Sequence, residues 1–165
     1  MDDKRSLLKH WDAIAVPLPV LIRLLLGGYF IYSGFGKIAE PVAFLKNIHL
    51  YEALPTEPAI FLNATAIVLP WIEIVCGLAL VLGLWIRGAA LNLAAMLVVF
   101  TPAILLRALA IRASDGTPFM EISFDCGCGT GAVIIWKKLL FNSTLLLLTI
   151  LALLSRCRRW ALSAR

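Results

Sequence analysis

Four long apolar stretches divide the chain, and each is long enough to cross a membrane as a helix. A helix needs about 20 mostly apolar residues to span the hydrocarbon core of a bilayer. The pattern predicts membrane-spanning helices at about residues 16–36, 59–84, 89–109 and 133–154. Lys137 and Lys138 lie near the start of the fourth stretch, where lysine side chains are expected to reach the lipid headgroups.

A weaker apolar pattern follows the first stretch. Pro41 can open a helix, and Val42, Leu45 and Ile48 continue at roughly helical spacing. We expect a short helix in the membrane interface, either as a lid over the outer end of the bundle or as a gate for a substrate. The expected fold is an all-α integral membrane protein, a four-transmembrane-helix bundle with this short interfacial helix, forming a single membrane domain over residues 1–165.

Composition excludes a soluble globular domain, because 61% of the residues are apolar and only 15% are charged. Soluble domains average about 45–50% apolar and about 25% charged residues. A cleaved signal peptide is an alternative for the N-terminus, but Arg23 would split its apolar region and no Ala-x-Ala site follows. The net charge of +5 needs no nucleic acid, since anionic lipid attracts basic residues beside a membrane.

Basic residues favour one orientation of the bundle, because cytoplasmic loops carry an excess of Lys and Arg. The termini and the second connection hold eight such residues, and the other two connections hold six. We therefore expect cytoplasmic termini, with the first and third connections on the periplasmic side of a bacterial inner membrane. The six residues are Lys37, Lys46, Arg107, Arg112, Lys137 and Lys138.

Cys126 and Cys128, separated by one glycine in the third connection, are the candidate catalytic residues. Oxidising compartments favour disulfides, and a disulfide that closes so small a ring should be strained and reducible. Three other interpretations stay open: free thiols, half of a copper or zinc site, or disulfides to a partner made only for assembly. No His lies nearby in the sequence, so we predict no metal site. Asp125 disfavours the thiolate of Cys126 and therefore favours Cys128 as the attacking thiol.

Cys76 and Cys157 are expected to differ from this pair. Cys76 lies in the middle of the second span, where a buried cysteine commonly acts as a small apolar side chain. Cys157 lies among arginines on the cytoplasmic flank, where it should stay reduced. We assign no role to Cys157.

Two charges, Arg23 and Glu73, fall within predicted spans. Each lies about 14 residues below the outer end of its span, roughly 20 Å down at 1.5 Å per residue. Because intramembrane charges usually face a partner inside the bundle, we expect an Arg23–Glu73 ion pair. It would be a clamp that fixes helix register or, alternatively, a proton or quinone site.

These residues together resemble a known family. The run from Arg23 through LLLGGYFIYSGFGK, the LP at Leu54, the LPWIEIVCGLALVLG from Leu69 and the Cys-Gly-Cys element resemble the MauE branch of the DoxX-like membrane proteins. The resemblance implies a four-helix fold related to vitamin K epoxide reductase, with Arg23, Lys37 and Glu73 as polar positions and Cys126 and Cys128 as the redox pair. The chain differs from vitamin K epoxide reductase in the one-residue spacing between Cys126 and Cys128 and in having no second outer cysteine pair.

The expected function is that of a membrane thiol–disulfide redox protein, hence a candidate thiol–disulfide oxidoreductase. The resemblance implies a thioredoxin-like partner and a disulfide-containing client, such as the small subunit of methylamine dehydrogenase. A membrane quinone is a candidate electron partner, with Trp71 and Trp136 as candidate lining residues. The alternative is a non-catalytic membrane scaffold or assembly factor in which the Cys-Gly-Cys disulfide is structural.

Overall fold

The computed structural model describes residues 17–50, 60–125 and 131–154. These residues form five helices and two strands. Four helices are long and apolar enough to cross a membrane, and a short helix follows the first of them, so the predicted all-α membrane fold is confirmed. The elements are α2 (Pro17–Ala39), α3 (Pro41–Leu50), α4 (Ile60–Leu82), α5 (Ile86–Asp115), β1 (Ser123–Asp125), β2 (Ala132–Ile134) and α6 (Ile135–Leu154).

The outward faces of the long helices are apolar, as lipid contact requires. Leu25 on α2, Val99 on α5 and Leu147 on α6 are all more than half exposed in the isolated chain. Contiguous apolar surface of this extent is rare on soluble monomers. The protein is therefore a multi-pass membrane protein whose exposed faces contact the bilayer.

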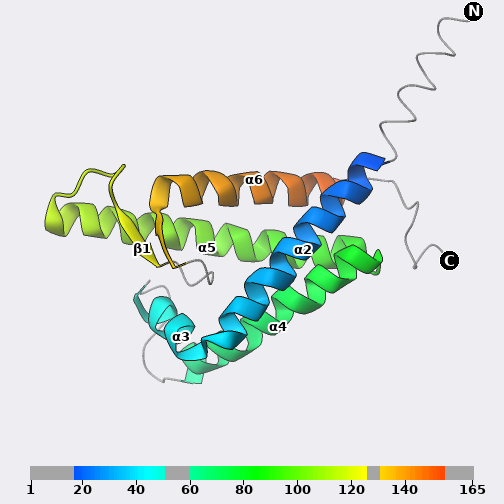
Figure 1. The fold of residues 1–165 in the computed structure, drawn as a ribbon, viewed down its shortest axis with the longest axis horizontal. Helices are drawn as coiled ribbons and strands as arrows, with labels where there is room; N and C mark the ends of the chain where they lie inside the picture. Colours follow the sequence, from blue (N-terminus) through cyan, green and yellow to red (C-terminus); the bar gives the residue numbers. More distant parts are fainter. Residues whose placement is uncertain (1–16, 51–59, 126–130, 155–165) are drawn as a thin grey trace, which may run out of the picture.

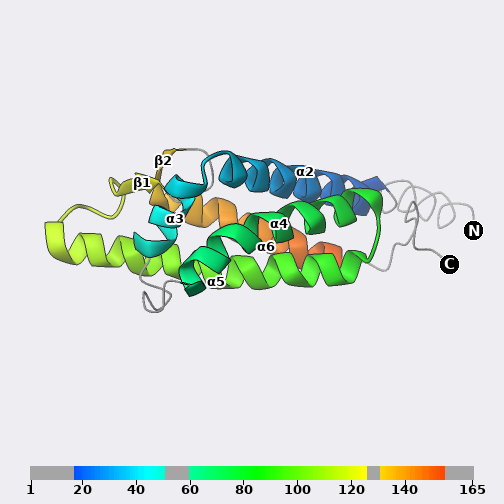
Figure 2. The same ribbon diagram turned by 90° about the horizontal axis from the view of Figure 1, so that it is seen from below.

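The four long helices form two antiparallel pairs, α2 with α4 and α5 with α6 (Figures 1 and 2). The start of α2, the turn from α4 to α5 and the end of α6 lie at one end of the bundle, which we call the terminal end (Figure 1). The end of α2, helix α3 and the β1–β2 strands lie towards the opposite end, which we call the hairpin end.

Glycines bring α2 and α4 into close contact. A Cβ atom on Gly27 would lie 2.6 Å from the carbonyl oxygen of Gly77, and one on Gly34 would lie 2.8 Å from that of Pro70. Small residues at such positions let membrane helices approach closely enough for their backbones to touch. This contact sets the register between α2 and α4.

Helix α4 ends in a turn that requires a glycine, Gly83, in the left-handed conformation. Gly83 has a φ of 71°, its N–H donates to Leu80 O, and the N–H of Leu84 donates to Ala79 O. This pair of hydrogen bonds is the Schellman motif, which needs a left-handed residue at the position of Gly83. Trp85 follows, largely exposed, at the terminal end.

Helix α5 is longer than the sequence pattern predicted. It continues to Asp115, six residues past the expected end at Leu109, and Gly116 in the left-handed conformation closes it. At 1.5 Å per residue its 30 residues span about 45 Å, against about 30 Å for the hydrocarbon core. The other three long helices match their predicted spans to within three residues at each end.

Helix α3 covers the hairpin end of α4. Phe44 and Ile48 are buried and contact Leu62 and Ala66 of α4. The structure therefore bears out a short helix between the first two spans, packed on the bundle as a lid would be.

Candidate functional site

The central feature of the bundle is a buried ion pair between α2 and α4. The Nζ of Lys37 donates to both carboxylate oxygens of Glu73 and, at 3.2 Å, to the hydroxyl of Ser33 one turn earlier. Both side chains are less than a tenth exposed. The ring of Phe44 on α3 lies 5.4 Å from the same Nζ, so α3 covers the pair from the hairpin end.

This pairing differs from the one expected from the sequence. Gly27 faces Gly77, so Arg23, four residues before Gly27, is level with about Val81. Val81 lies eight residues beyond Glu73 (81 − 73), or roughly 12 Å along the helix. The equal-depth estimate ended the first span at residue 36, whereas α2 continues to Ala39, so Lys37 lies within the helix. The structure shows a Lys37–Glu73 pair, and the expected Arg23–Glu73 pair stays a prediction; Arg23 is buried nearer the terminal end.

A second lysine, Lys138 on α6, also points into the bundle. It is only 8% exposed, its Nζ lies 3.3 Å from the hydroxyl of Tyr29, and it sits 5.5 Å from the ring of Phe141. The expectation that both lysines of α6 reach the headgroups is wrong for Lys138. Its neighbour Lys137 is exposed and lies over the ring of Trp136, so for Lys137 the expectation stays a prediction.

The sequence analysis therefore missed Lys138, although a signal was present. Buried residues of α6 recur at helical spacing, and half of them are polar: Ile135, Lys138, Asn142, Leu145, Thr149 and Ala152. Such a stripe predicts one face turned to the interior. It follows that Lys138 belongs to the buried face and not to the membrane interface.

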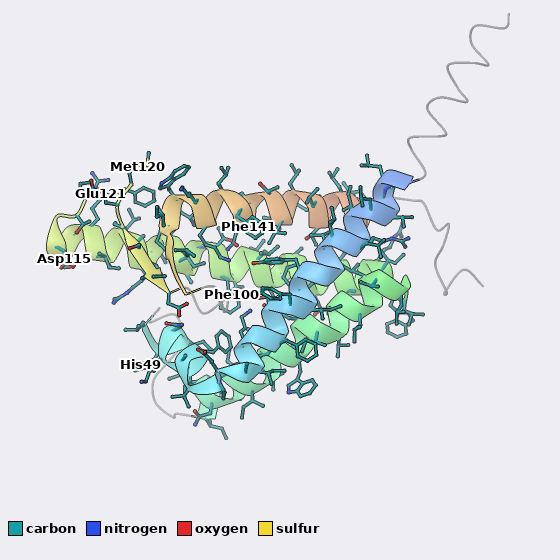
Figure 3. All side chains as sticks on the ribbon, in the orientation of Figure 1. His49, Phe100, Asp115, Met120, Glu121 and Phe141 are labelled. Carbon is teal, nitrogen blue, oxygen red and sulfur yellow. The ribbon has the colours of Figure 1, made fainter. Side chains whose placement is uncertain are left out.

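Three of the four charged side chains that are buried in the described residues, Lys37, Glu73 and Lys138, border one cavity of about 50 Å³. Phe100 on α5 lies between α5 and the α2–α4 pair, where it forms part of the wall (Figure 3). The polar lining comes from α2, α4 and α6, whereas α5 contributes only apolar side chains. The lining includes Tyr29, Ser33, Lys37, Phe44, Glu73, Phe100, Lys138 and Asn142.

A second hollow faces the lipid between α2, α3 and α4. It has a volume of about 430 Å³ and is lined mainly by apolar residues, with Trp71 on α4, Pro41 on α3 and Asn63 among them. Lys37 borders both this groove and the cavity. Trp71, a candidate lining residue from the sequence, therefore does border a groove open to the membrane.

An antiparallel hairpin carries the segment with the paired cysteines. Asp125 at the end of β1 is paired with Ala132 at the start of β2. The N–H of Ile135 donates to Ile122 O at 3.0 Å, and both isoleucines are buried against α5. Cys126 and Cys128 themselves lie outside the described residues, as does Cys157. The strands on either side of them are fixed to the bundle at their base.

Cys76 is a free cysteine buried in α4. It contacts the apolar cluster that contains Leu26, Phe30 and Leu80. These surroundings are those of a small apolar side chain, which agrees with the interpretation from the sequence.

Comparison with known protein families matches residues 15–155 to the methylamine utilisation protein MauE. The match spans every described helix and strand and the intervening Cys-Gly-Cys segment. This chain belongs to the MauE family. No curated protein and no solved structure matches it. Membership of the MauE family suggests a role in methylamine utilisation.

The hairpin end of this MauE protein thus carries two chemically different features. One is a set of ionisable side chains, Lys37, Glu73 and Lys138, enclosed between the helices. The other is the cysteine segment between β1 and β2. The first can bind protons, water or a polar group, and the second can exchange electrons through its thiols.

Proposed function

We propose that this protein is a membrane thiol–disulfide redox protein that assists disulfide formation or maturation of periplasmic proteins. Cys126 and Cys128 are its catalytic residues. For methylamine utilisation the client is the disulfide-containing small subunit of methylamine dehydrogenase, and the electron partner is a periplasmic thioredoxin-like protein. The proposal draws on the MauE family match and on the cysteine pair at the bundle end.

The observation that carries the proposal is the anchored hairpin. Asp125 and Ala132 are direct cross-strand partners, so the cysteine segment leaves and re-enters the fold at neighbouring strands, which lie about 4.8 Å apart. A disulfide requires two Cα atoms within about 4.4–6.8 Å of each other. The two strands that flank the cysteine segment thus lie side by side, which supports pairing of the two thiols.

The proposed reaction is an exchange between one disulfide and one dithiol. A client thiolate attacks the protein disulfide and forms a mixed disulfide, and the second client thiol then resolves it. The client gains a disulfide, and Cys126 and Cys128 gain two electrons and two protons. The thioredoxin-like partner, in its disulfide form, removes the same two electrons and two protons and restores the pair.

A membrane quinone is a further candidate electron acceptor. The reaction would convert the dithiol and a quinone into the disulfide and a quinol, so that electrons and protons balance. The lipid-facing groove beside Trp71 and Lys37 is large enough to admit a small ring system and opens where a membrane-soluble molecule would arrive. This groove supports the candidate without being required by the exchange reaction.

The structure also supports the proposed orientation, with cytoplasmic termini and a periplasmic hairpin in the bacterial inner membrane. Two of the six basic residues counted on the outer side, Lys37 and Lys138, are buried inside the bundle. Removing them leaves four against the eight on the terminal side (6 − 2). The excess of basic residues towards the cytoplasm is therefore larger than the sequence count indicated.

The test is to trap the thiols in intact cells with an alkylating label after acid quenching. We expect Cys126 and Cys128 to be found in both dithiol and disulfide forms as growth conditions change. Complete reduction under every condition would refute the redox proposal. Replacing Cys126 and Cys128 singly by alanine should trap mixed disulfides, whose attached protein identifies the partner.

Maturation of the client protein in a Cys128→Ser variant separates the redox protein from a non-catalytic scaffold. A scaffold with a structural disulfide predicts that Cys128→Ser still supports maturation of the client. The redox proposal predicts that Cys128→Ser abolishes maturation while the protein still accumulates in the membrane. Cys76→Ser is the matched control, because Cys76 is buried in the apolar core and should leave maturation unchanged.

A further inference from the structure

The buried charges of the hairpin end exceed what a structural clamp needs. The Lys37–Glu73 pair alone joins α2 to α4. Lys138 adds a further buried charge from α6, within the same cavity lining. Apolar residues of similar volume stabilise a protein interior as well as buried charges do, or better. Ionisable side chains held inside a membrane bundle are typical of ion and proton pathways.

The cavity between these side chains has the size and polarity to hold water. It measures about 50 Å³. One water needs about 10–15 Å³ of such space and two to four polar partners, so about three waters fit. Lys37 contacts Ser33 at 3.2 Å and Lys138 contacts Tyr29 at 3.3 Å along its wall. Enclosed water can join these groups and Glu73 into one hydrogen-bonded network.

The titratable groups of this network come from three helices. Lys37 and Tyr29 belong to α2, Glu73 to α4 and Lys138 to α6. Among the described lining residues, α5 contributes Met96, Leu97, Phe100 and Ile104, and α3 contributes Phe44, none of which titrates. Lys37 contacts Glu73, Lys138 contacts Tyr29, and all four line one cavity, so the proton occupancy of each group depends on the others.

The cavity lies towards the hairpin end. Lys37 is two residues from the end of α2, and Lys138 is three residues from the start of α6. Among the described residues, the cover on this side consists of α3, through Phe44, and of the hairpin base that precedes α6. The path from the cavity to the aqueous compartment at the hairpin end is therefore short.

We propose that this cavity is a proton-binding site centred on Glu73. A proton from the aqueous compartment at the hairpin end converts the Glu73 carboxylate to the carboxylic acid. The net charge of the cavity rises by one, and the hydrogen bonds of Lys37 and Lys138 with the enclosed water rearrange. Release of the proton reverses the change. This site goes beyond the thiol–disulfide function and does not require the cysteines.

The experiment is an infrared titration of the full-length protein reconstituted in phospholipid vesicles, from acidic to alkaline pH. We expect a reversible carboxylic-acid band that shifts in heavy water and is missing from Glu73→Gln. Lys138→Met should move the midpoint of this band by at least tenfold in proton concentration, because Lys138 lines the same cavity as Glu73. Lys137→Met is the matched control, since Lys137 is exposed and should leave the midpoint unchanged.

Two results would overturn the proposal. One is a Glu73 side chain that stays ionised over the whole pH range in which the protein remains folded. The other is equal midpoints in Lys138→Met, Lys137→Met and the parent protein. If Glu73→Gln does not fold, the midpoints of the carboxylic-acid band in Lys138→Met and Lys137→Met still test the proposal. Thiol trapping in the same samples reports the redox proposal separately, so either one can fail alone.

Discussion

The close contact between α2 and α4 makes a sharp prediction for Gly27→Ala. The added Cβ would lie 2.6 Å from Gly77 O and 2.6 Å from a methyl of Val81. Ordinary contact begins near 3.4 Å, so the helices must separate by about 0.8 Å at this point (3.4 − 2.6). The carbonyl oxygen is part of a helix backbone and cannot rotate away.

The expected cost follows from overpacking and from lost contacts along the interface. Extra carbon atoms in a well-packed interior cost about 1–3 kcal/mol. A gap of about 0.5–1 Å also removes a quarter to a half of each affected contact energy. We therefore expect Gly27→Ala to destabilise the protein by about 3 kcal/mol, which lowers the folding equilibrium about a hundredfold.

The neighbouring glycine provides the control. A Cβ on Gly28 meets nothing within 4 Å, so Gly28→Ala keeps the contact and gains the helix preference of alanine, about 0.8–1.0 kcal/mol. Thermal unfolding of the purified variants, with the amount of protein accumulated in membranes, measures the difference. Equal stability of Gly27→Ala and Gly28→Ala would refute the close contact. Gly77→Ala should repeat the loss, since its Cβ would lie 2.8 Å from Gly27 O.

Three further predictions concern the ion pair, the turn and the hairpin. Glu73→Leu should lower the amount of folded protein at least tenfold, because it leaves Lys37 buried without its carboxylate. The double variant Glu73→Leu with Lys37→Met should recover part of this loss. Unchanged accumulation of Glu73→Leu would show that the ion pair is not a clamp. Gly83→Ala should cost about 1–2 kcal/mol in thermal unfolding, because its φ is 71°. Ile135→Ala should cost about 2–5 kcal/mol and speed alkylation of the hairpin thiols, whereas Ile134→Ala, at an exposed position, should change neither.

The four spans could be predicted from hydropathy because each crosses the bilayer with few charges. The end of α5 could not, because Arg112 and Asp115 stop the apolar pattern while the helix itself continues. Hydropathy reports where the membrane ends and not where the helix ends. Gly116, which closes α5 in the left-handed conformation, was the available signal for the true end.

The candidate site was predictable only in part. Glu73 and Lys37 were both identified, Lys37 from the family resemblance. Their pairing was not predicted, because the hydropathy pattern ended the first span at residue 36 and α2 continues three residues further, to Ala39. Lys138 was missed because a lysine near a helix start is commonly interfacial; the stripe that it shares with Asn142 and Thr149 was the available signal, and its contact with Tyr29 agrees with it. The two short strands beside the cysteines were not predicted, since three residues each give too little alternation to recognise.

The unusual length of α5 limits how another protein can reach the cysteine segment. Its last turns, with Asp115, project beyond the start of α6, and the chain returns past Met120 and Glu121 to the hairpin (Figures 1 and 3). This projecting end borders the hairpin on one flank and blocks approach from that direction. For the proposed exchange reaction, the partner would therefore have to approach the hairpin from a side other than that of the α5 end, which narrows the angles at which the two proteins can meet.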